Sequence, residues 1–475
     1  MAQEPDELYR RQNRRAELRK KKLEEQKRMK RRLILAAVLL VVCGVGIFFI
    51  AKNTDSFGFA SLKHPEETAP PVTRPSETQA APAEESRAAR HNPITTIHIK
   101  AAGDLNVTTA VVDSGLSAGG FDYTQAFIDV AAVLSDADLT VMNFEGNVCG
   151  EPYGSETRSA PPELLTGLLN AGVDVIQTAN SYSVWNGLIG LNATLNAIRN
   201  SGLIPVGSYN TPEEFERSRG YLICDVRGVK VALVAFTKGL GGMGMPAGNE
   251  ECVNLLYEDY DDLYKKVDRD GITKILRAAA SEKPDITIAM LHWGSEYNDQ
   301  ISKTQTEIVE LMQKEGVDVI LGSHPHTLQW VDFNESAGTL VAYSLGDFFG
   351  DATSAGTDYS IILDIEITKD ATSGITKVTD FSYTPIFTLA EEDREEASGI
   401  SRQVVRLRTA MDARAGNFVD RITDVTNGNM EYSLTRIHDR VSGKDQDPVQ
   451  IAAAQKAKEE AKKAAEKAKA EQNKK

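Results

Sequence analysis

The chain is poor in cysteine. Only four of its 475 residues are cysteine, and three of these, Cys149, Cys224 and Cys252, lie outside its one long apolar run. So few cysteines exclude a disulfide-rich scaffold, and none has the spacing of a metal-binding cysteine motif. Outside the cell, the three thiols would allow at most one internal disulfide and leave one thiol over.

Histidine is scarce too, since the chain has seven, yet three of them follow two apolar runs near its centre. His292 follows residues 285–291, and His324 and His326 belong to a Gly-Ser-His-Pro-His motif that follows residues 317–321. A His-x-His pair leaving a strand can direct two imidazoles at one point, as a transition-metal site requires. We therefore expect the functional site here.

Long apolar runs are absent except at residues 33–51, which contain no charged side chain. As a helix this run would be about 28 Å long at ~1.5 Å per residue, enough to cross a hydrocarbon core of ~30 Å. The preceding residues 1–32 carry thirteen Lys and Arg against six Asp and Glu, so a net charge of +7 precedes a remainder of −22. This basic head is too long for a secretory signal peptide. The positive-inside rule then predicts a single transmembrane helix in the cell membrane, with a cytoplasmic N-terminus and an extracellular main domain.

Composition divides the rest of the chain. Residues 1–32 form a basic cytoplasmic segment that we expect to contact anionic membrane lipid, with no nucleic acid as partner. Residues 52–93 are rich in Pro, Glu, Ser, Thr and Ala and predict a disordered extracellular linker. The folded domain is expected at 94–395, followed by a helical or irregular extension at 396–445 and a charged Ala/Lys/Glu tail at 446–475.

Strand-like and helical patterns alternate through the folded domain, which predicts an α/β protein with functional loops at the carboxyl ends of its strands. Later, residues 359–367 and 375–388 predict antiparallel strands that close the sheet, and residues 399–415 predict a helix. The other expected strands are 95–102, 138–143, 173–178, 229–236, 285–291 and 317–322, and the other expected helices are 121–135, 188–201, 271–281 and 303–314.

Polar side chains suited to a metal or phosphate site follow these strands. Taken singly, Asp104 could be a turn residue, Glu145 an exposed loop acid and Asn180 a helix cap. Together they would share one edge of the sheet with the histidines. Carboxylates and imidazoles bind Mn, Fe or Zn as divalent ions, and a pair of such ions could activate water and hold a phosphoryl or carbonyl oxygen. Glu296, four residues after His292, could orient a ligand or carry a proton.

The order of these motifs resembles the CapA family of poly-γ-glutamate capsule synthesis proteins. The motifs are Gly-Asp, Asn-Phe-Glu, Ala-Asn, His-Trp-Gly-Ser-Glu-Tyr, Gly-Ser-His-Pro-His and Ser-Leu-Gly-Asp-Phe-Phe, and the resemblance spans about residues 96–390. The family is related to calcineurin-like metallophosphoesterases, so the resemblance implies a four-layer α/β/β/α sandwich with a dinuclear metal site, behind a membrane anchor. The implied catalytic residues are His292, Glu296 and His324, and the implied metal positions are Asp104, Glu145, Asn180, His292, His324 and His326.

The sequence departs from the family pattern at two places. Ser181 and Tyr182 stand where the family has Asn-His, and a tyrosine, with a pKa of ~10, cannot accept a proton near neutral pH as imidazole does. Asp347 stands where Asn is commoner. A binding-only member of the family therefore stays open as an alternative.

Three functions follow. The first is an anchored extracellular protein that takes part in synthesis, export or processing of a γ-glutamyl capsule polymer by metal-dependent hydrolysis, with membrane synthase subunits as partners. The second is a non-catalytic scaffold or polymer-binding partner of such a synthase. The third is a nucleotidase-type phosphoesterase, which normally needs an Asp-x-His motif where this chain has Asp104-Leu105-Asn106. Because the body is acidic, contact with a polyanionic polymer would need a local basic or metal-bearing groove.

Overall fold

The computed structural model describes residues 93–415 and 422–446. The basic segment, the apolar run at 33–51, the linker and the charged tail lie outside the described residues, so the predictions made for them remain predictions. Among the helices that are described, none is both long and apolar enough to cross a membrane.

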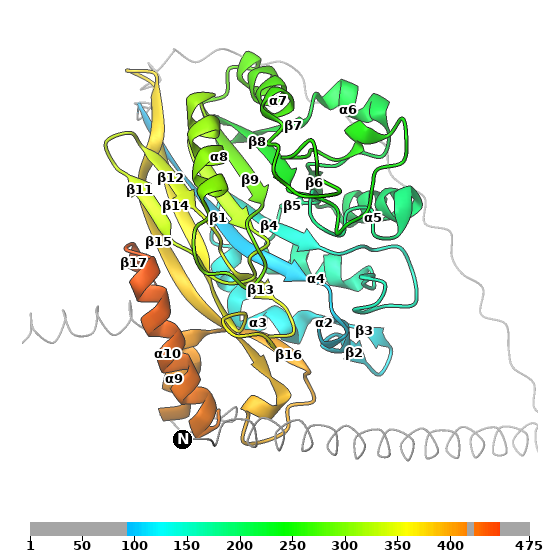
Figure 1. Ribbon diagram of the computed structural model, residues 1–475. Coiled ribbons are helices and arrows are strands. Elements are labelled where there is room, and N and C mark those ends of the chain that lie inside the picture. Colours follow the sequence, from blue (N-terminus) through cyan, green and yellow to red (C-terminus); the bar gives the residue numbers. More distant parts are fainter. Residues whose placement is uncertain (1–92, 416–421, 447–475) are drawn as a thin grey trace, which may run out of the picture. The chain divides into compact units, whose positions relative to one another are not determined.

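Two large β-sheets form the centre of the described chain (Figure 1). Sheet I has nine strands, of which β1 is central: β1 lies between β4 and β14, and it also pairs with the short β13. In order, sheet I contains β16 (Arg402–Arg406), β15 (Ile375–Ala390), β14 (Tyr359–Asp370), β1 (Ile94–Asn106), β4 (Leu139–Glu145), β5 (Val175–Gln177) and β6 (Ile204–Val206), with β13 (Asp347–Phe349) on β1 and β17 (Lys444–Asp445) on β15.

Sheet II has six strands in the order β11 (Val331–Asn334), β12 (Thr339–Ala342), β10 (Val319–Ser323), β9 (Ile286–His292), β8 (Val229–Thr237) and β7 (Tyr221–Val226). Its inner strands β8, β9, β10 and β12 are parallel, as are β1, β4, β5 and β6 of sheet I. The carboxyl ends of the parallel strands therefore lie along one edge in each sheet, which is where such sheets carry their sites.

Alternating residues of the inner strands face two different cores. In β8, for example, Val231, Leu233 and Ala235 belong to the core between the sheets, while Ala232, Val234 and Phe236 face the helices that cover sheet II. Burial on both faces explains why these strands read as continuous apolar runs in the sequence.

Helices cover the outer face of each sheet. Helices α3 (Thr124–Leu134) and α4 (Glu163–Ala171) pack on sheet I, and α7 (Arg269–Ser281) and α8 (Lys303–Lys314) pack on sheet II. The layers thus run helix, sheet, sheet, helix, and the expected mixed α/β sandwich is confirmed. The remaining elements on this part of the chain are α2 (Thr109–Asp113), β2 (Leu116–Ser117), β3 (Gly120–Phe121), α5 (Gly187–Ser201) and α6 (Pro212–Ser218).

Local sequence signals set the helix ends. Helix α4 ends at Gly172, whose φ of 102° is the left-handed conformation that glycine adopts at low cost. Helix α8 begins at Ser302, which forms a capping box with Gln305 and satisfies two backbone N–H groups that the first turn leaves free.

The helix expected at 399–415 is wrong in its first half. Residues Arg402–Arg406 form strand β16, which pairs antiparallel with β15, and α9 begins only at Leu407 (Leu407–Ala415). The vacant edge of β15 decides this, because Val404 and Val405 are β-branched and bury opposite faces against two cores. Helix α10 (Asp424–Arg440) then places Met430 and Ile437 in the core between the sheets.

Candidate metal centre

Six titratable side chains from both sheets meet where the parallel strands end. Asp104 lies in β1, Glu145 is the last residue of β4, His292 is the last residue of β9, and His324 and His326 directly follow β10. The sixth is Asp347 at the start of β13. All six are at least 95% buried, in contrast to the exposed loop acid that one interpretation of Glu145 would require.

The backbone of the His-x-His pair is held in an unusual conformation. His324 has a φ of 89° and His326 a φ of 58°, both in the region that non-glycine residues rarely adopt. Each such residue costs about 1–3 kcal/mol, so the surrounding contacts must impose it. One contact is the hydrogen bond that the His324 N–H donates to Asp104 Oδ2 at 2.9 Å, and another runs from the Tyr297 N–H to Pro325 O at 2.8 Å.

Two glycines allow the strand ends to come this close. A Cβ atom on Gly103 would lie 1.8 Å from the carbonyl oxygen of Gly346, and one on Gly322 would lie 2.0 Å from that of Tyr343. Any side chain at either position would push apart the segments that carry Asp104, His324 and Asp347. The glycines before Asp104 and His324 are therefore part of the site.

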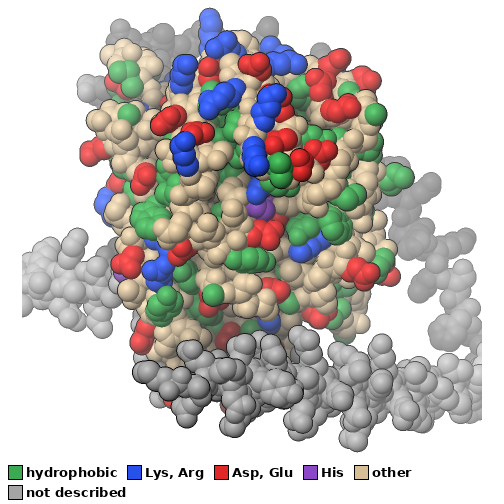
Figure 2. Space-filling view, in the orientation of Figure 1, with side chains coloured by type: hydrophobic (Ala, Val, Ile, Leu, Met, Phe, Trp, Pro, Cys, Tyr) green, Lys and Arg blue, Asp and Glu red, His purple; other side chains and the backbone are tan. Residues whose placement is uncertain are grey.

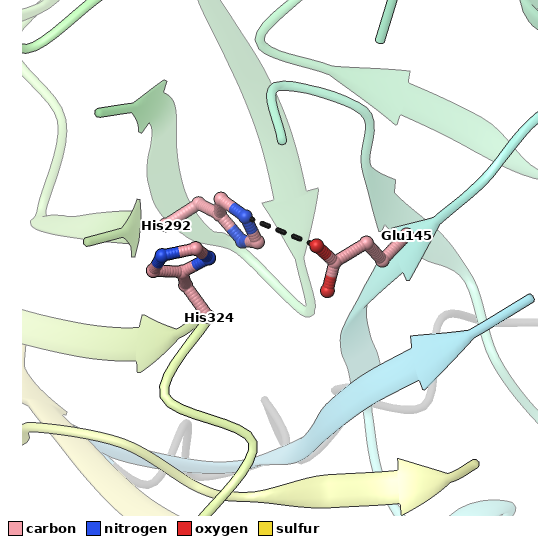
Figure 3. Close-up of side chains that lie close together, drawn as sticks. All are labelled: Glu145, His292 and His324. Atoms are coloured by element: carbon pink, nitrogen blue, oxygen red, sulfur yellow. Dashed lines mark ion pairs between the residues drawn. The ribbon is translucent and has the colours of Figure 1, made fainter. Parts of the chain in front are cut away.

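The six side chains form two donor sets that meet at Glu145. In the first set, ligand atoms of Glu145, His292 and His324 lie within 4.8 Å of one another (Figure 3). In the second, Asp104, His326 and Asp347 do the same. Glu145 reaches both, because its Oε1 lies 3.4 Å from His292 Nε2 and its Oε2 lies 3.6 Å from His326 Nε2.

The carboxylate of Glu145 lacks ordinary partners. It is fully buried, and neither of its oxygens accepts a hydrogen bond from any group in residues 93–415 or 422–446. A buried carboxylate depends on nearby positive charge, which His292 and His326 supply in part at 3.4 and 3.6 Å, and a bound cation would add to it. Carboxylate oxygens together with imidazole nitrogens are the donors that Mn, Fe and Zn accept, so these residues fit a divalent metal.

The charges in the cluster respond to burial and to one another. Burial raises the pKa of Asp104, and it raises the pKa of Asp347 to about 7. Burial would also raise the pKa of Glu145, but His292 and His326 outweigh it and lower that pKa to about 2. Three carboxylates in one buried cluster are thus balanced only in part by the protein, which is the charge pattern of a cation site.

The pKa values of the two histidines in the His-x-His pair are shifted in opposite directions. Burial, followed by the neighbouring His292, lowers the pKa of His324 well below its usual value, so this ring is neutral near pH 7 and can offer a lone pair to a metal. For His326, burial acts in the same direction, but Asp347, whose Oδ1 lies 2.7 Å from His326 Nδ1, and Glu145 raise the pKa well above its usual value.

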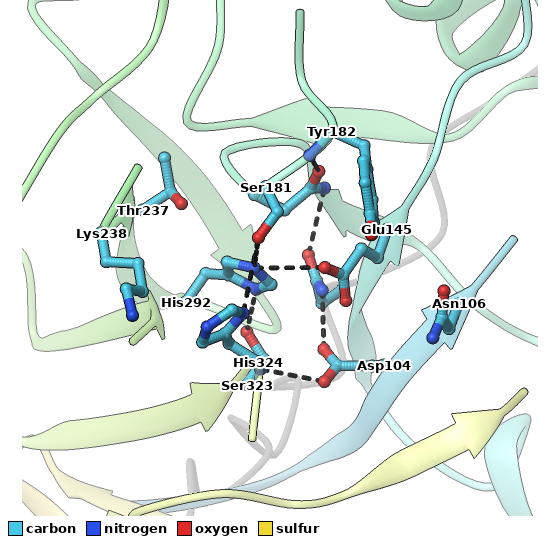
Figure 4. A network of polar contacts seen from close by, with 12 residues as sticks. Asp104, Asn106, Glu145, Ser181, Tyr182, Thr237, Lys238, His292, Ser323 and His324 are labelled. Atoms are coloured by element: carbon cyan, nitrogen blue, oxygen red, sulfur yellow. Dashed lines mark hydrogen bonds and ion pairs between the residues drawn. The ribbon is translucent and has the colours of Figure 1, made fainter. Parts of the chain in front are cut away.

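Asparagine and serine side chains hold the carboxylates and imidazoles in place (Figure 4). Asn143 donates to Asp104 Oδ1 at 2.6 Å. Ser181 Oγ lies 3.0 Å from His292 Nε2 and 3.4 Å from His324 Nδ1, and Ser323 Oγ lies 3.2 Å from His292 Nδ1. These contacts fix the ring orientations, as residues behind metal ligands commonly do.

Asn180 is buried beside Asn143, and Glu296 lies on the exposed side of the histidine pair. The Asn180 amide is engaged by backbone groups, since Oδ1 accepts from the Tyr182 N–H at 3.0 Å and Nδ2 donates to Phe144 O at 2.6 Å. Glu296 is exposed, yet its carboxylate lies within 4.8 Å of nitrogens of His324 and His326. The structure thus gives Asn180 a role in shaping its loop and places Glu296 where solvent and the histidine pair meet.

Sequence reasoning missed three residues of this site: Asp347, Ser181 and Asn143. Asp347 could have been found, because it lies in the Ser-Leu-Gly-Asp-Phe-Phe motif that follows an expected strand. Ser181 was noticed only as a departure from a family pattern, and its contact with two histidines depends on the pairing of distant strands. Asn143 begins the Asn-Phe-Glu motif, but it lies within a fully buried strand, and only Glu145 of that motif was expected to bind metal.

The loop that carries Glu296 is tied to the C-terminal helix. Asp299 accepts hydrogen bonds from Arg436 Nη2 at 2.8 Å and from Arg440, whose side chain is 2% exposed. Gln329 Nε2 also donates to Asn298 O at 2.8 Å. Helix α10 therefore contributes to the position of the loop above the histidine pair.

Fold and site together define a two-sheet α/β protein with a buried carboxylate and imidazole cluster of metal-binding type. Residues 98–352 match the model of the family described as bacterial capsule synthesis protein PGA_cap. This range is more than half of the chain, and the chain belongs to that family.

Two curated relatives from bacilli are similar to the chain. It is 27% identical over 261 residues to the capsule biosynthesis protein CapA of Bacillus anthracis, covering 54% of this chain and 60% of that protein. It is 25% identical over 265 residues to the PGA biosynthesis protein CapA of Bacillus subtilis strain 168, covering 54% of this chain and 63% of that protein. The chain thus spans less than two thirds of the length of either relative.

A solved structure of a novel phosphatase from Mycoplasma pneumoniae is also similar, with 13% identity, a TM-score of 0.37, and coverage of 62% of this chain and 94% of that one. The helix–sheet–sheet–helix order of this chain follows from its own strand pairing and hydrophobic cores, and not from this similarity.

Proposed function

We propose that this chain is an anchored, extracellular member of the capsule synthesis family that takes part in making or processing a γ-glutamyl surface polymer. Family membership and the names of the two bacillar relatives support the polymer. The apolar run at 33–51 and the charge difference across it support the anchor and the orientation.

The observation that carries the site's role is the position of Glu145. A fully buried carboxylate without hydrogen-bond donors, shared between two sets of buried acids and imidazoles, is what a pair of divalent ions would require. Glu145, His292 and His324 would hold one ion, and Asp104, His326 and Asp347 would hold the other, with Glu145 between them.

Ions held there would supply Lewis-acid chemistry, namely polarisation of a carbonyl or phosphoryl oxygen and acidification of water. The chain's own residues would do the rest. Glu296, exposed but within reach of both histidines, is positioned to pass protons between the site and solvent. Metal-dependent hydrolysis of a γ-glutamyl amide is the reaction that we propose for this arrangement.

The test is complementation of a deletion strain. Wild type should restore the surface polymer, and His324→Ala should not, while His438→Ala, a change at a half-exposed histidine of α10, should restore it as wild type does. Metal content of each purified full-length protein should be measured beside it. Normal polymer in the deletion strain would refute the proposal.

A non-catalytic polymer-binding partner of a synthase is the second candidate, and Tyr182 is the observation that favours it. Burial and the nearby Glu145 raise the pKa of Tyr182 to about 12, so it cannot act as a base where the family has a histidine. This candidate predicts that His324→Ala restores the polymer fully, whereas removal of residues 1–51 abolishes it.

A further inference from the structure

Two positions at which the sequence departs from an expected motif, Tyr182 and Asn106, contact the same arginine. Tyr182 stands in place of the family's histidine, and Asn106 stands where a phosphoesterase would have the histidine of Asp-x-His. The guanidinium of Arg158 lies 4.1 Å from the centre of the Tyr182 ring, and its Nη1 donates to Asn106 Oδ1 at 2.8 Å. The two side chains that stand at these histidine positions, Tyr182 and Asn106, therefore hold the Arg158 guanidinium in place.

Arg158 is held in a fixed orientation. Besides Asn106, its Nη1 donates to the carbonyl oxygen of Val107 at 3.2 Å, so both N–H groups of this nitrogen are used. Its backbone has a φ of 53°, which a non-glycine residue rarely adopts, and its N–H is bonded to Gly154 O at 2.8 Å. The Tyr182 ring is in turn packed edge-on against Trp185.

One side of the guanidinium remains available. Nε and Nη2 have no hydrogen-bond acceptor within residues 93–415 and 422–446, and these two nitrogens form the fork that pairs with a planar oxyanion through two parallel bonds. Arg158 is partly exposed, and Asn106, to which it donates, pairs with Glu145 in the register of β1 and β4, so the guanidinium lies near the metal cluster. Figure 4 shows Asn106 and Tyr182 near Glu145, with Lys238 beyond His324 on the far side.

We propose that Arg158 is the carboxylate-recognition residue of this site, and that it pairs with a free carboxylate of a γ-linked glutamyl chain whose amide lies at the metal cluster. This inference rests on the proposed function for the polymer. In a γ-linked chain every unit keeps a free carboxylate two bonds from the amide nitrogen, so a cation beside the cluster meets each amide together with its carboxylate. Arg158 also supplies the local basic group that an acidic protein needs to bind a polyanion. Figure 2 shows one face of the molecule, on which a histidine reaches the surface between basic and acidic side chains.

The test measures binding of a synthetic γ-linked glutamyl decamer to the full chain in detergent by titration calorimetry. Arg158→Gln should weaken binding at least tenfold, and Arg158→Lys nearly as much, because lysine keeps the charge but lacks the fork. Metal content should stay at the wild-type level in both. Arg277→Gln is the matched control, since Arg277 makes a two-bond pair with Glu315 on the outer helices and should bind as wild type does.

Two further probes test the chemistry and the bracing. A decamer with its carboxylates converted to amides should bind at least tenfold more weakly to wild type and about equally to wild type and Arg158→Gln. Tyr182→Phe, which keeps the ring, should bind as wild type does, and Tyr182→Ala should bind severalfold more weakly. The two Tyr182 variants keep the proposal testable if Arg158→Gln has a much lower Tm than wild type.

The outcomes separate this inference from the proposed function. If Arg158→Gln binds the decamer as wild type does and restores the polymer in cells, the inference is overturned and the proposed function stands. If inorganic phosphate, and not the decamer, binds in an Arg158-dependent way, the assignment to a carboxylate is overturned. If wild type binds the decamer but the deletion strain makes normal polymer, the carboxylate site stands and the proposed function falls.

Discussion

Replacing Glu145 should empty both halves of the metal centre at once. Its two oxygens face different histidines, 3.4 Å from His292 Nε2 and 3.6 Å from His326 Nε2, which places this buried carboxylate between the two donor sets. We expect about two divalent ions per wild-type chain and close to none in Glu145→Gln. His292→Ala and Asp347→Ala each remove a donor from one set, so each should keep about one ion.

The same change should remove most of the stabilisation that metal gives. A ligand that binds only the folded state stabilises it by about 2.7 kcal/mol at a hundredfold excess over its Kd. For a domain of this size each kcal/mol moves Tm by roughly 1–2 °C, so each ion should raise Tm by roughly 4 °C. Added metal should therefore raise Tm by roughly 8 °C in wild type, by half as much in the two single-set variants, and by almost nothing in Glu145→Gln.

The metal-free proteins give a second, independent result. Glu145→Gln removes a buried carboxylate whose charge His292 and His326 stabilise, so without metal this variant should melt below the temperature of metal-free wild type near pH 7. The assay is elemental analysis of metal content beside thermal unfolding with and without added Mn or Zn. Glu315→Gln is the matched control, because the Glu315 side chain is 11% exposed and bonded to Arg277 on the outer helices. Two ions retained by Glu145→Gln, or only one ion lost, would refute the shared-ligand reasoning, and a metal-free Tm at or above that of wild type would contradict the stabilisation of Glu145 by the two histidines.

Two more changes test how the fold supports the site, each by urea unfolding. Gly322→Ala should destabilise the protein by about 1–3 kcal/mol or more, since its Cβ would lie 2.0 Å from Tyr343 O. Gly428→Ala, in α10 with no atom within 4 Å of the added Cβ, should instead stabilise the protein by about 0.5–1 kcal/mol. Equal effects of the two changes would show that Gly322 does not approach Tyr343 tightly. Asp299→Ala should lower the free energy of unfolding by about 3–5 kcal/mol, because it leaves the buried Arg440 without its carboxylate. It should also loosen the loop that carries Glu296, so that hydrogen exchange of this loop becomes faster. An exchange rate unchanged from wild type would contradict the link between the loop and α10.

Much of the fold could be predicted from local pattern. The apolar runs at 138–143, 229–236, 285–291 and 317–322 became β4, β8, β9 and β10, and the helical patterns between them became α3, α5, α7 and α8. Such runs are readable because strands buried on both faces are apolar throughout and amphipathic helices repeat every 3.6 residues. Strand β16 was misread because its pattern is short and polar at both ends, and only the open edge of β15 makes it a strand.

The sequence by itself indicated most of the residues that form the buried cluster, since a histidine pair in a chain of seven histidines and acids after apolar runs are visible without coordinates. Only the tertiary structure decided how these residues are grouped into donor sets. It paired β1 with β13 and so brought Asp347 to the cluster, and it packed the two sheets so that Ser181 meets His292 and His324. It also placed Glu145 between two donor sets and set Arg158 against both Asn106 and Tyr182. These contacts join residues tens to hundreds of positions apart, and their distances follow from the packing of two sheets, which no local pattern in the chain encodes.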